Sequence, residues 1–372
     1  MSRKAEIVRI IFAAGTTGGH LYPALAIANY TKKNVKNSDI LFLVSRRVSS
    51  DISKGFGIKT GFQTAAIYGR GWNRNKLFSI IPCLLETFLS LIQSFILILK
   101  FKPDLVVGMG SYLSVSPIIT AYLMRIPTLI HEQNVVPGFT SKLLANIATE
   151  VDVAFDETKK YLPCKSRIVT VGNPIRDNIL KAVDKRYNLV SKKKKTILVF
   201  GGSQGAHQIN VTSSDTFINI RGDLKDWHII HITGEKDYQL ILDKYKKTYL
   251  DVKVMPFSEH IGDIYTISRL VISRAGAMTI TEISLFGIPA ILIPYPHAAA
   301  NHQVYNGKLL SDNGAGTIIE EKNLTVSTLS KEVLGLIKNK HKLEYMALSS
   351  RKLGRLHINS TEKIFERIRT YI

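Results

Sequence analysis

The stretch that decides the fold lies near the start of the chain, where residues 7–24 read IVRIIFAAGTTGGHLYPA. A run of β-branched and apolar residues, typical of a buried strand, leads into a turn that contains three glycines. Pro23 then falls in the first turn of the expected helix, where a missing backbone N–H is tolerated. A strand, a glycine loop and a helix in this order predict an α/β unit with a ligand site at the loop.

The same arrangement recurs in the second half, where residues 196–208 read TILVFGGSQGAHQ after a basic run that we interpret as a solvated loop. Short apolar runs alternate with helical stretches along the chain, which predicts parallel sheets in α/β layers. Because the pattern restarts, we expect two domains, residues 1–176 and 177–354. The expected strands are residues 7–12, 40–44, 104–107, 128–131, 151–155, 168–171, 196–200, 227–232, 252–257, 270–273 and 290–293.

Charge and cysteine content narrow the function classes. The chain has 372 residues, 45% of them hydrophobic, and a formal net charge of +21, which suits either nucleic acid or an anionic membrane. Fourteen Lys and Arg stand against four Asp and Glu in residues 1–100. No zinc spacing, helix-turn-helix signature or aromatic RNA-binding strand accompanies this charge, so no nucleic-acid partner is expected. Cys83 and Cys164 fit no metal or disulfide spacing, which favours a reducing compartment.

One segment, residues 77–99, is almost continuously apolar and long enough to suggest a transmembrane helix. Pro82, Glu86 and Gln93 interrupt it, and it lies between expected strands, so we interpret it as a helix of the first domain. Part of it should pack on the sheet, and the rest could face a bilayer; a fully buried helix is the alternative. The part that could face a bilayer consists of Phe78, Ile80, Ile81, Leu84, Leu85 and Phe88, and the segment is flanked by Arg70, Arg74, Lys76, Lys100 and Lys102.

Polar motifs follow several of the expected strands. The sequence His131-Glu132-Gln133-Asn134 ends one strand, and Pro296–Gln303 follows another. The carboxyl ends of parallel strands are where such sheets bind ligands. Ser273–Glu282 follows a third strand, and its small residues leave backbone N–H groups free for phosphate. Glu282 could accept hydrogen bonds from a ribose diol, although a lone Glu near a helix start more often complements the helix dipole.

Seven motifs in sequence order resemble the MurG family, the N-acetylglucosamine transferases that convert lipid I to lipid II in peptidoglycan synthesis. The resemblance spans nearly the whole chain. The seven motifs are the first glycine loop with His20, Gly108-Met109-Gly110-Ser111-Tyr112, His131–Asn134, Gly172–Arg176, Gly201–Ala206, Ser273–Ala277 with Glu282, and Asn301–Gln303.

The resemblance implies a GT-B fold, in which two Rossmann-like domains with parallel sheets face a deep cleft. It also implies that the last helix, at about residues 355–372, packs back on the first domain. His20 occupies the position of the family's candidate base on the acceptor side. The implied donor-binding residues are Thr17, Gly18, Gly19, Asn134, Arg176, Ser203, Ser258, Ala277, Met278, Thr279, Ile280, Thr281, Glu282 and Gln303.

The implied reaction is inverting transfer of N-acetylglucosamine from UDP to undecaprenyl-pyrophosphoryl-N-acetylmuramyl-pentapeptide. A single displacement needs a base for the attacking hydroxyl, stabilisation of the leaving UDP and a dry cleft. We assign the first to His20 and the second to Arg176, Ser203 and the N–H groups of residues 277–279. The chain has no Asp-x-Asp motif, and neither a metal nor a cofactor is expected. The polyprenyl acceptor and the basic surface predict a peripheral protein on an anionic membrane, at the cytoplasmic face of the plasma (inner) membrane.

Two alternatives use parts of the same pattern. Another GT-B lipid glycosyltransferase, such as a galactolipid synthase, would share the two glycine loops, but Asn301–Gln303 and the full motif order favour the peptidoglycan enzyme. An NADP-dependent oxidoreductase would use Arg46 and Arg47, which follow the second expected strand. It would also need the spacing G-x-G-x-x-G, which neither glycine loop has.

Overall fold

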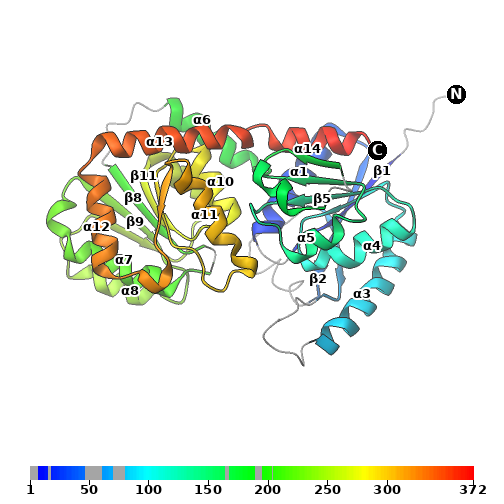
Figure 1. Cartoon of the computed structure of the whole chain (residues 1–372), viewed down its shortest axis with the longest axis horizontal. Helices are drawn as coiled ribbons and strands as arrows, with labels where there is room; N and C mark the ends of the chain where they lie inside the picture. Colours follow the sequence, from blue (N-terminus) through cyan, green and yellow to red (C-terminus); the bar gives the residue numbers. More distant parts are fainter. Residues whose placement is uncertain are drawn as a thin grey trace. The chain divides into compact units, whose positions relative to one another are not determined.

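The computed structural model describes residues 7–15, 18–46, 61–69, 80–163, 167–188, 195–202 and 204–372. It divides the chain into two compact units (Figure 1). Unit 1 consists of residues 1–176 together with 359–372, and unit 2 consists of residues 177–358. Each unit is an α/β layer structure built around one parallel sheet.

In the described part of unit 1, seven strands pair in the order β3-β2-β1-β4-β5-β6-β7, and every pair is parallel. The strands are β1 Val8–Ala13, β2 Ser38–Ser45, β3 Gln63–Ile67, β4 Leu105–Gly108, β5 Thr128–Glu132, β6 Glu150–Val153 and β7 Arg167–Thr170. The helices are α1 Gly18–Asn34, α3 Ile80–Phe101, α4 Val115–Leu123, α5 Phe139–Leu144 and α14 Ser360–Arg369, with short 3-10 turns at Tyr112–Ser114 and Asp156–Tyr161.

In the described part of unit 2, six strands pair in the order β10-β9-β8-β11-β12-β13, again all parallel. The strands are β8 Lys195–Phe200, β9 Trp227–Ile232, β10 Val252–Met255, β11 Ser268–Ser273, β12 Ala290–Leu292 and β13 Gly316–Ile318. The helices are α6 Asp177–Asn188, α7 His207–Asn219, α8 Tyr238–Lys246, α9 Ile261–Ile267, α10 Ala277–Leu285, α11 His302–Asp312, α12 Val326–Ile337 and α13 Lys340–Gly354.

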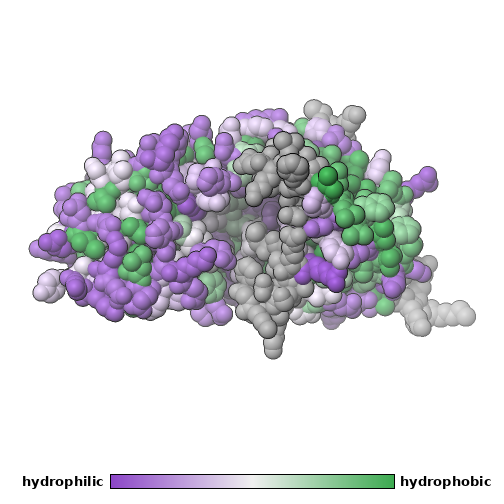
Figure 2. All heavy atoms as spheres, turned by 90° about the horizontal axis from the view of Figure 1, so that it is seen from below, coloured by the Kyte–Doolittle hydropathy of each residue, from purple (hydrophilic) through white to green (hydrophobic). Residues whose placement is uncertain are grey.

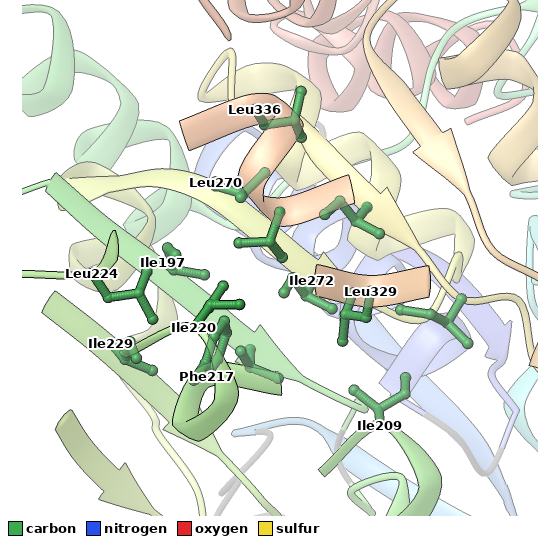
Figure 3. Close-up of a cluster of buried hydrophobic side chains, with 14 of the residues drawn as sticks. Ile197, Ile209, Phe217, Ile220, Leu224, Ile229, Leu270, Ile272, Leu329 and Leu336 are labelled. Carbon is green, nitrogen blue, oxygen red and sulfur yellow. The ribbon is translucent and has the colours of Figure 1, made fainter. Parts of the chain in front are cut away.

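The central strands are rich in apolar residues because helices cover both faces of a parallel sheet. In unit 2, Ile197 of β8, Ile229 of β9 and Ile272 of β11 are fully buried on one face of the sheet. Phe217 of α7 and Leu329 of α12 pack onto that face (Figure 3). Burial of such side chains contributes roughly 1.5–3 kcal/mol each to folding, which makes this cluster a principal source of stability for unit 2.

Each sheet has a point where its strand order reverses. In unit 1 the reversal lies between β1 and β4, and in unit 2 it lies between β8 and β11. The loops that follow such a pair of strands lead to opposite faces of the sheet and leave a crevice at its carboxyl edge. In unit 1 the two loops are tied together, because the Ser114 hydroxyl donates a 3.0 Å hydrogen bond to the carbonyl of Ala13. The predicted motifs therefore fall where this fold binds ligands.

Helix α14 belongs to unit 1, although all of unit 2 precedes it in the sequence. Ile364 and Ile368 are fully buried in the core of unit 1, and Phe365 contacts Tyr30 of α1 with ring centroids 5.3 Å apart. At its first residue, the Ser360 hydroxyl donates a hydrogen bond to the carbonyl of Asn173. Near its end, Arg367 pairs with the buried carboxylate of Glu150.

Candidate active site

The first glycine loop brings His20 close to the end of β1. Helix α1 begins at Gly18, earlier than expected, so Pro23 lies inside the helix instead of in its first turn. His20 lies in the first turn and is partly buried. A Cβ placed on Gly15 would lie 2.8 Å from a ring carbon of His20 and 2.9 Å from the Cβ of Ser111. Any side chain at position 15 would therefore displace the imidazole. Glycine at position 15 therefore allows the His20 ring to pack against the loop.

His20 is connected to two buried side chains at the end of β5. Its Nδ1 lies 3.0 Å from Oε1 of Gln133, whose Nε2 lies 3.0 Å from Nδ1 of His131. Nε2 of His131 lies 2.9 Å from the carbonyl oxygen of Gly172. Burial lowers the pKa of His131 to about 4, so this imidazole is neutral at physiological pH. The sequence motif had placed these residues at a strand end but had not connected them to His20.

Glu132, which follows His131, is fully engaged in hydrogen bonds. One carboxylate oxygen accepts from the backbone N–H and the side-chain amide of Asn134, at 2.9 and 3.0 Å. The other oxygen accepts from the Ser141 hydroxyl at 2.5 Å and the Gly138 N–H at 3.3 Å. With 1% of its surface exposed and four donors around it, Glu132 orients the loop that contains Asn134. His20, by contrast, is partly accessible.

The remaining predicted residues of unit 1 lie on nearby loops. The guanidinium of Arg176 stacks on the ring of Tyr22 of α1, 4.2 Å from its centroid, which gives this cation a defined position. Gly18 and Gly19 are the first two residues of α1. Thr17 lies outside the described residues, as Ser203 does in unit 2.

Unit 2 contains a pocket of about 350 Å³ at the switch point of its sheet. Its lining comes from both sides of that switch point, because the second glycine loop follows β8 and the Arg274–Gly276 loop follows β11. Of the predicted donor residues, it brings together Thr279 and Gln303. The lining residues are Gly201, Gly202, Gly205, Ala206, His207, Arg274, Gly276, Thr279, Tyr295 and Gln303.

Two helix N-termini open onto this pocket. Helix α7 begins at His207 and helix α10 at Ala277, and neither has a side-chain cap or an acidic residue in its first turn. The first backbone N–H groups of a helix have no partner inside the helix, and the helix dipole adds partial positive charge there. Two such ends in one pocket form a site for an anion with several oxygens, such as a diphosphate.

Comparison with known proteins agrees with this geometry. The glycosyltransferase family 28 N-terminal domain matches residues 10–153, and the family 28 C-terminal domain matches residues 196–364. The chain belongs to glycosyltransferase family 28. A protein of Acetivibrio thermocellus, a UDP-N-acetylglucosamine–N-acetylmuramyl-(pentapeptide) pyrophosphoryl-undecaprenol N-acetylglucosamine transferase, is 35% identical over 97% of this chain and 98% of its own length. A protein of Halothermothrix orenii with the same name is 38% identical over 94% of this chain and 95% of its own length.

Solved structures support the same assignment. The crystal structure of Acinetobacter baumannii MurG matches with a TM-score of 0.77 and 26% identity, over 98% of this chain and 99% of that chain. A UDP-glucose:anthocyanidin 3-O-glucosyltransferase matches with a TM-score of 0.71 and 14% identity, over 98% of this chain and 99% of that chain, which shows the fold alone. The resemblance to the MurG family and the expected GT-B fold are confirmed. Membership of family 28 is contrary to the oxidoreductase alternative. Of the two arginines on which that alternative depended, Arg46 stacks on Tyr68 and Arg47 lies outside the described residues.

Within its described residues, the family 28 C-terminal domain holds the predicted donor residues of unit 2 on α10, at the start of α11 and in the loop after β10. Glu282 is 8% exposed, near the middle of α10, and Gln303 accepts a 3.0 Å hydrogen bond from the Tyr295 N–H. Ser258 lies in the loop after β10 and is partly exposed. The side chain of Ile280 is fully buried in the core, and its N–H bonds to the Gly276 carbonyl, so a direct ligand contact from Ile280 is not supported. Ala277 and Thr281 are also buried, whereas Met278 and Thr279 are partly exposed.

Three pocket residues with large polar or aromatic side chains, Arg274, Tyr295 and His207, were not predicted as site residues. Arg274 donates hydrogen bonds to the carbonyls of Ile293 and Pro294, at 3.2 and 3.3 Å, and pairs with Glu321. Its guanidinium also stacks on Tyr295, which holds a positive charge at the pocket wall. His207 lies 2.9 Å from the carboxylate of Asp237. Arg274 and His207 lie in the quoted motifs, but nothing in the spacing indicated that they would face the pocket, and Tyr295 lies just before the quoted Pro296–Gln303 stretch.

The apolar helix of unit 1, α3, exposes most of its large apolar side chains and buries two serines. Ser90 and Ser94 are buried, together with Ile98, along one stripe of the helix. The opposite face is exposed and forms an apolar surface (Figure 2). Phe78 and the side chain of Ile80, which were predicted to join this surface, lie outside the described positions. The exposed residues are Ile81, Leu84, Leu85, Phe88, Leu89, Ile92, Phe95, Ile96 and Leu99.

Proposed function

We propose that this chain transfers N-acetylglucosamine from UDP-N-acetylglucosamine to undecaprenyl-pyrophosphoryl-N-acetylmuramyl-pentapeptide, which converts lipid I to lipid II. The names of the family 28 relatives support the sugar and the acceptor. The observation that carries the donor half is the pocket of about 350 Å³ with two uncapped helix N-termini. In this proposal unit 2 binds the donor, and unit 1 binds the acceptor and the membrane.

The donor diphosphate is assigned to the pocket of unit 2. The first N–H groups of α7 and α10 donate to its oxygens, and Arg274 supplies positive charge at the wall. Arg176 and Ser203 are further proposed contacts, by resemblance to the family. Charge develops on the leaving diphosphate as the glycosidic bond breaks, so these groups lower the barrier because they are already oriented.

The nucleoside end of the donor is assigned to Glu282 and the loop at Ser258. A carboxylate can accept two hydrogen bonds from the ribose hydroxyls, and near-complete burial strengthens charge-assisted bonds. The backbone near Ser258 is proposed to contact uracil. Gln303 and Asn134 are proposed as further donor contacts, as the resemblance implies.

His20 is proposed as the base. The muramyl hydroxyl forms a bond to the anomeric carbon of the donor while the bond from that carbon to UDP breaks. The hydroxyl proton passes to the imidazole, and UDP leaves with the bonding electrons. Glu132, the other acid or base at this strand end, has its carboxylate occupied by four donors. This occupancy favours His20.

The exposed face of α3 is proposed to dock on the bilayer that carries the acceptor. Among the described residues, one segment, Ile81–Phe101, is both long enough and apolar enough to cross a membrane. Only 17% of its 18-residue apolar window is buried. The helix, however, connects β3 to β4, which lie in one parallel sheet. A crossover helix cannot span a bilayer while both neighbouring strands stay in that sheet, so we favour peripheral binding. The exposed face of α3 has large apolar side chains, and its buried face has serines. This arrangement suits a helix whose exposed face contacts lipid.

The test is an assay of the purified full-length chain with UDP-N-acetylglucosamine and a water-soluble lipid I analogue that has a short prenyl chain. We expect formation of the disaccharide product and release of UDP, with other UDP-sugars much poorer donors. His20→Ala should lower turnover by roughly 10²–10⁴-fold while the affinity for UDP changes little. Transfer to a diacylglycerol acceptor instead, with none to the lipid I analogue, would contradict the proposal.

A further inference from the structure

The contacts around His131 fix the position of its single ring proton. The carbonyl oxygen of Gly172, 2.9 Å from Nε2, can only accept a hydrogen bond, so Nε2 of His131 must carry the proton. Because burial lowers the pKa of His131 to about 4, the ring is neutral. Its Nδ1 is therefore an acceptor.

The same reasoning fixes the orientation of the Gln133 amide. The nitrogen of this amide lies 3.0 Å from the backbone carbonyl oxygen of residue 131 and 3.0 Å from the acceptor Nδ1 of His131. Both partners need a donor, so the NH₂ group must point toward them. The amide oxygen of Gln133 must then face Nδ1 of His20, at 3.0 Å.

An amide oxygen can only accept, so Nδ1 of His20 must carry a proton. A neutral imidazole has one N–H, so the lone pair of His20 lies on Nε2. In the described part of the chain, no side chain or carbonyl bonds to Nε2. We propose that Gln133 and His131 are positioning residues that hold His20 in the Nδ1-protonated tautomer, which leaves Nε2 as the atom that takes the proton from the acceptor hydroxyl.

This inference rests on the proposed function, because it gives the base an atom and a tautomer. Such control affects the rate directly, since an imidazole with its proton on the wrong nitrogen cannot act as a base toward the substrate. The chain of contacts from His20 through Gln133 to His131, here called the relay, is also held in place by its surroundings. Gln133 and His131 are buried, and the backbone carbonyl of Gln133 accepts a 3.2 Å hydrogen bond from Asn173. Gly15 packs against the His20 ring from the loop side.

The direct test is long-range ¹H–¹⁵N correlation NMR on the full-length protein labelled with ¹⁵N-histidine. The His20 signals are assigned by their loss in His20→Ala. We expect a protonated Nδ1 and an unprotonated Nε2 in His20, and the opposite arrangement in His131. A wild-type His20 with its proton on Nε2 would overturn the proposal whatever the variants do.

The variant that removes the acceptor is Gln133→Met, which has a similar length. We expect His20 to lose its single tautomer and kcat to fall at least about ten-fold, with UDP affinity unchanged. Gln133→Glu keeps an acceptor oxygen opposite Nδ1 of His20 but removes the NH₂ donor from the two acceptor atoms of residue 131, so we expect the proton to stay on Nδ1 while turnover falls below the wild-type value. Gln239→Met, on the exposed surface of α8, is the matched control and should change neither.

The outcomes separate the relay from the base. An unchanged His20 tautomer in Gln133→Met would overturn the relay. If the expected tautomer is found but His20→Ala retains full turnover, the relay stands and the assignment of the base in the proposed function fails.

Discussion

Gly205 and Thr233 approach each other backbone to backbone, so that a Cβ on residue 205 would lie 2.1 Å from the carbonyl oxygen of Thr233. Gly205 also has a φ of +74°, a conformation that favours glycine. Gly205→Ala should therefore lower the free energy of unfolding by about 2 kcal/mol or more and weaken UDP binding, because the loop that lines the pocket must move. Urea unfolding and calorimetry with UDP measure the two effects.

Gly222→Ala is the matched control for this change. A Cβ on Gly222 meets no atom within 4 Å, and the residue lies in the same unit, away from the pocket. We expect its stability and UDP affinity to stay close to those of the wild type. Equal effects of the two substitutions would show that the close contact with Thr233 is not what requires glycine at position 205.

Glu282→Gln should weaken donor binding. The substitution keeps the shape of the side chain but removes the charge that strengthens its bonds to the ribose, so we expect a loss of about 1.5–3 kcal/mol in UDP affinity by calorimetry. Glu344→Gln, an exposed residue of α13 that lies 3.7 Å from Lys340, is the control and should have no effect. If Glu282→Gln has the same UDP affinity as the wild type, the assignment of Glu282 to the donor ribose is wrong.

The exposed face of α3 can be tested by making it polar. Leu84 and Phe88 are 64% and 60% exposed, so serine at both positions should leave the fold intact. We expect binding to vesicles that contain phosphatidylglycerol to weaken by about ten-fold or more, because the apolar area available for insertion is lost. Turnover on a water-soluble acceptor should stay within about two-fold of the wild-type value.

The control pair for α3 is Leu240→Ser with Leu348→Ser, two exposed leucines of unit 2. This pair should leave vesicle binding unchanged. Salt should weaken wild-type binding, because exposed charges are screened within a Debye length of roughly 10 Å at 0.1 M. A similar loss of binding in both double variants would contradict a docking site on α3.

Asp152 predicts a particular dependence of stability on pH. Its carboxyl is fully buried, and burial together with the neighbouring Glu150 raises its pKa well above the ordinary 3.8. Arg367 and Arg167 oppose this shift with smaller effects, and Tyr371 also faces Glu150. Folding therefore takes up a proton, so the contribution of Asp152 is largest below about pH 4 and is lost as the pH rises toward its folded pKa.

Asp152→Asn removes this titration while keeping the shape of the protonated acid. Compared with the wild type, the variant should gain stability as the pH is raised from 5 to 8, by at most about 1.4 kcal/mol per pH unit. Urea unfolding at several pH values measures the difference. Glu150→Gln is the informative contrast, because it leaves Arg367 without its carboxylate and should destabilise the protein at every pH. Parallel pH curves for the wild type and Asp152→Asn would show that Asp152 does not titrate in this way.

The amino-acid pattern predicted the central strands and the loops that follow them, because buried parallel strands have continuous apolar runs. It missed β3 and β13, which lie at the two sheet edges. The three residues of β13 are too few for a pattern, and β3 is mostly exposed, so it carries little apolar signal. Helix α3 was predicted to expose residues up to 88, but its exposed apolar face continues to Leu99.

The candidate site was predictable only in part. Glycine loops and polar strand ends are visible in the sequence, so the positions of His20 and Thr279 at carboxyl edges followed from topology. The link from His20 through Gln133 to His131 depends on side-chain orientation, which strand spacing does not determine. It also needs the carbonyl of Gly172, from a loop forty residues further along, and no local pattern indicates that contact.

The placement of α14 determines which parts of the chain contain a complete core. Unit 2 is continuous in sequence, so residues 177–358 include every residue of its core. Unit 1 is discontinuous, so a fragment of residues 1–176 would lack Ile364 and Ile368, which are fully buried in its core. Ser360 bonds to Asn173, and Asn173 bonds to Gln133, so that fragment would also lose a support of the proposed base, His20. We therefore expect residues 177–358 to fold as a separate fragment and residues 1–176 to fail to do so.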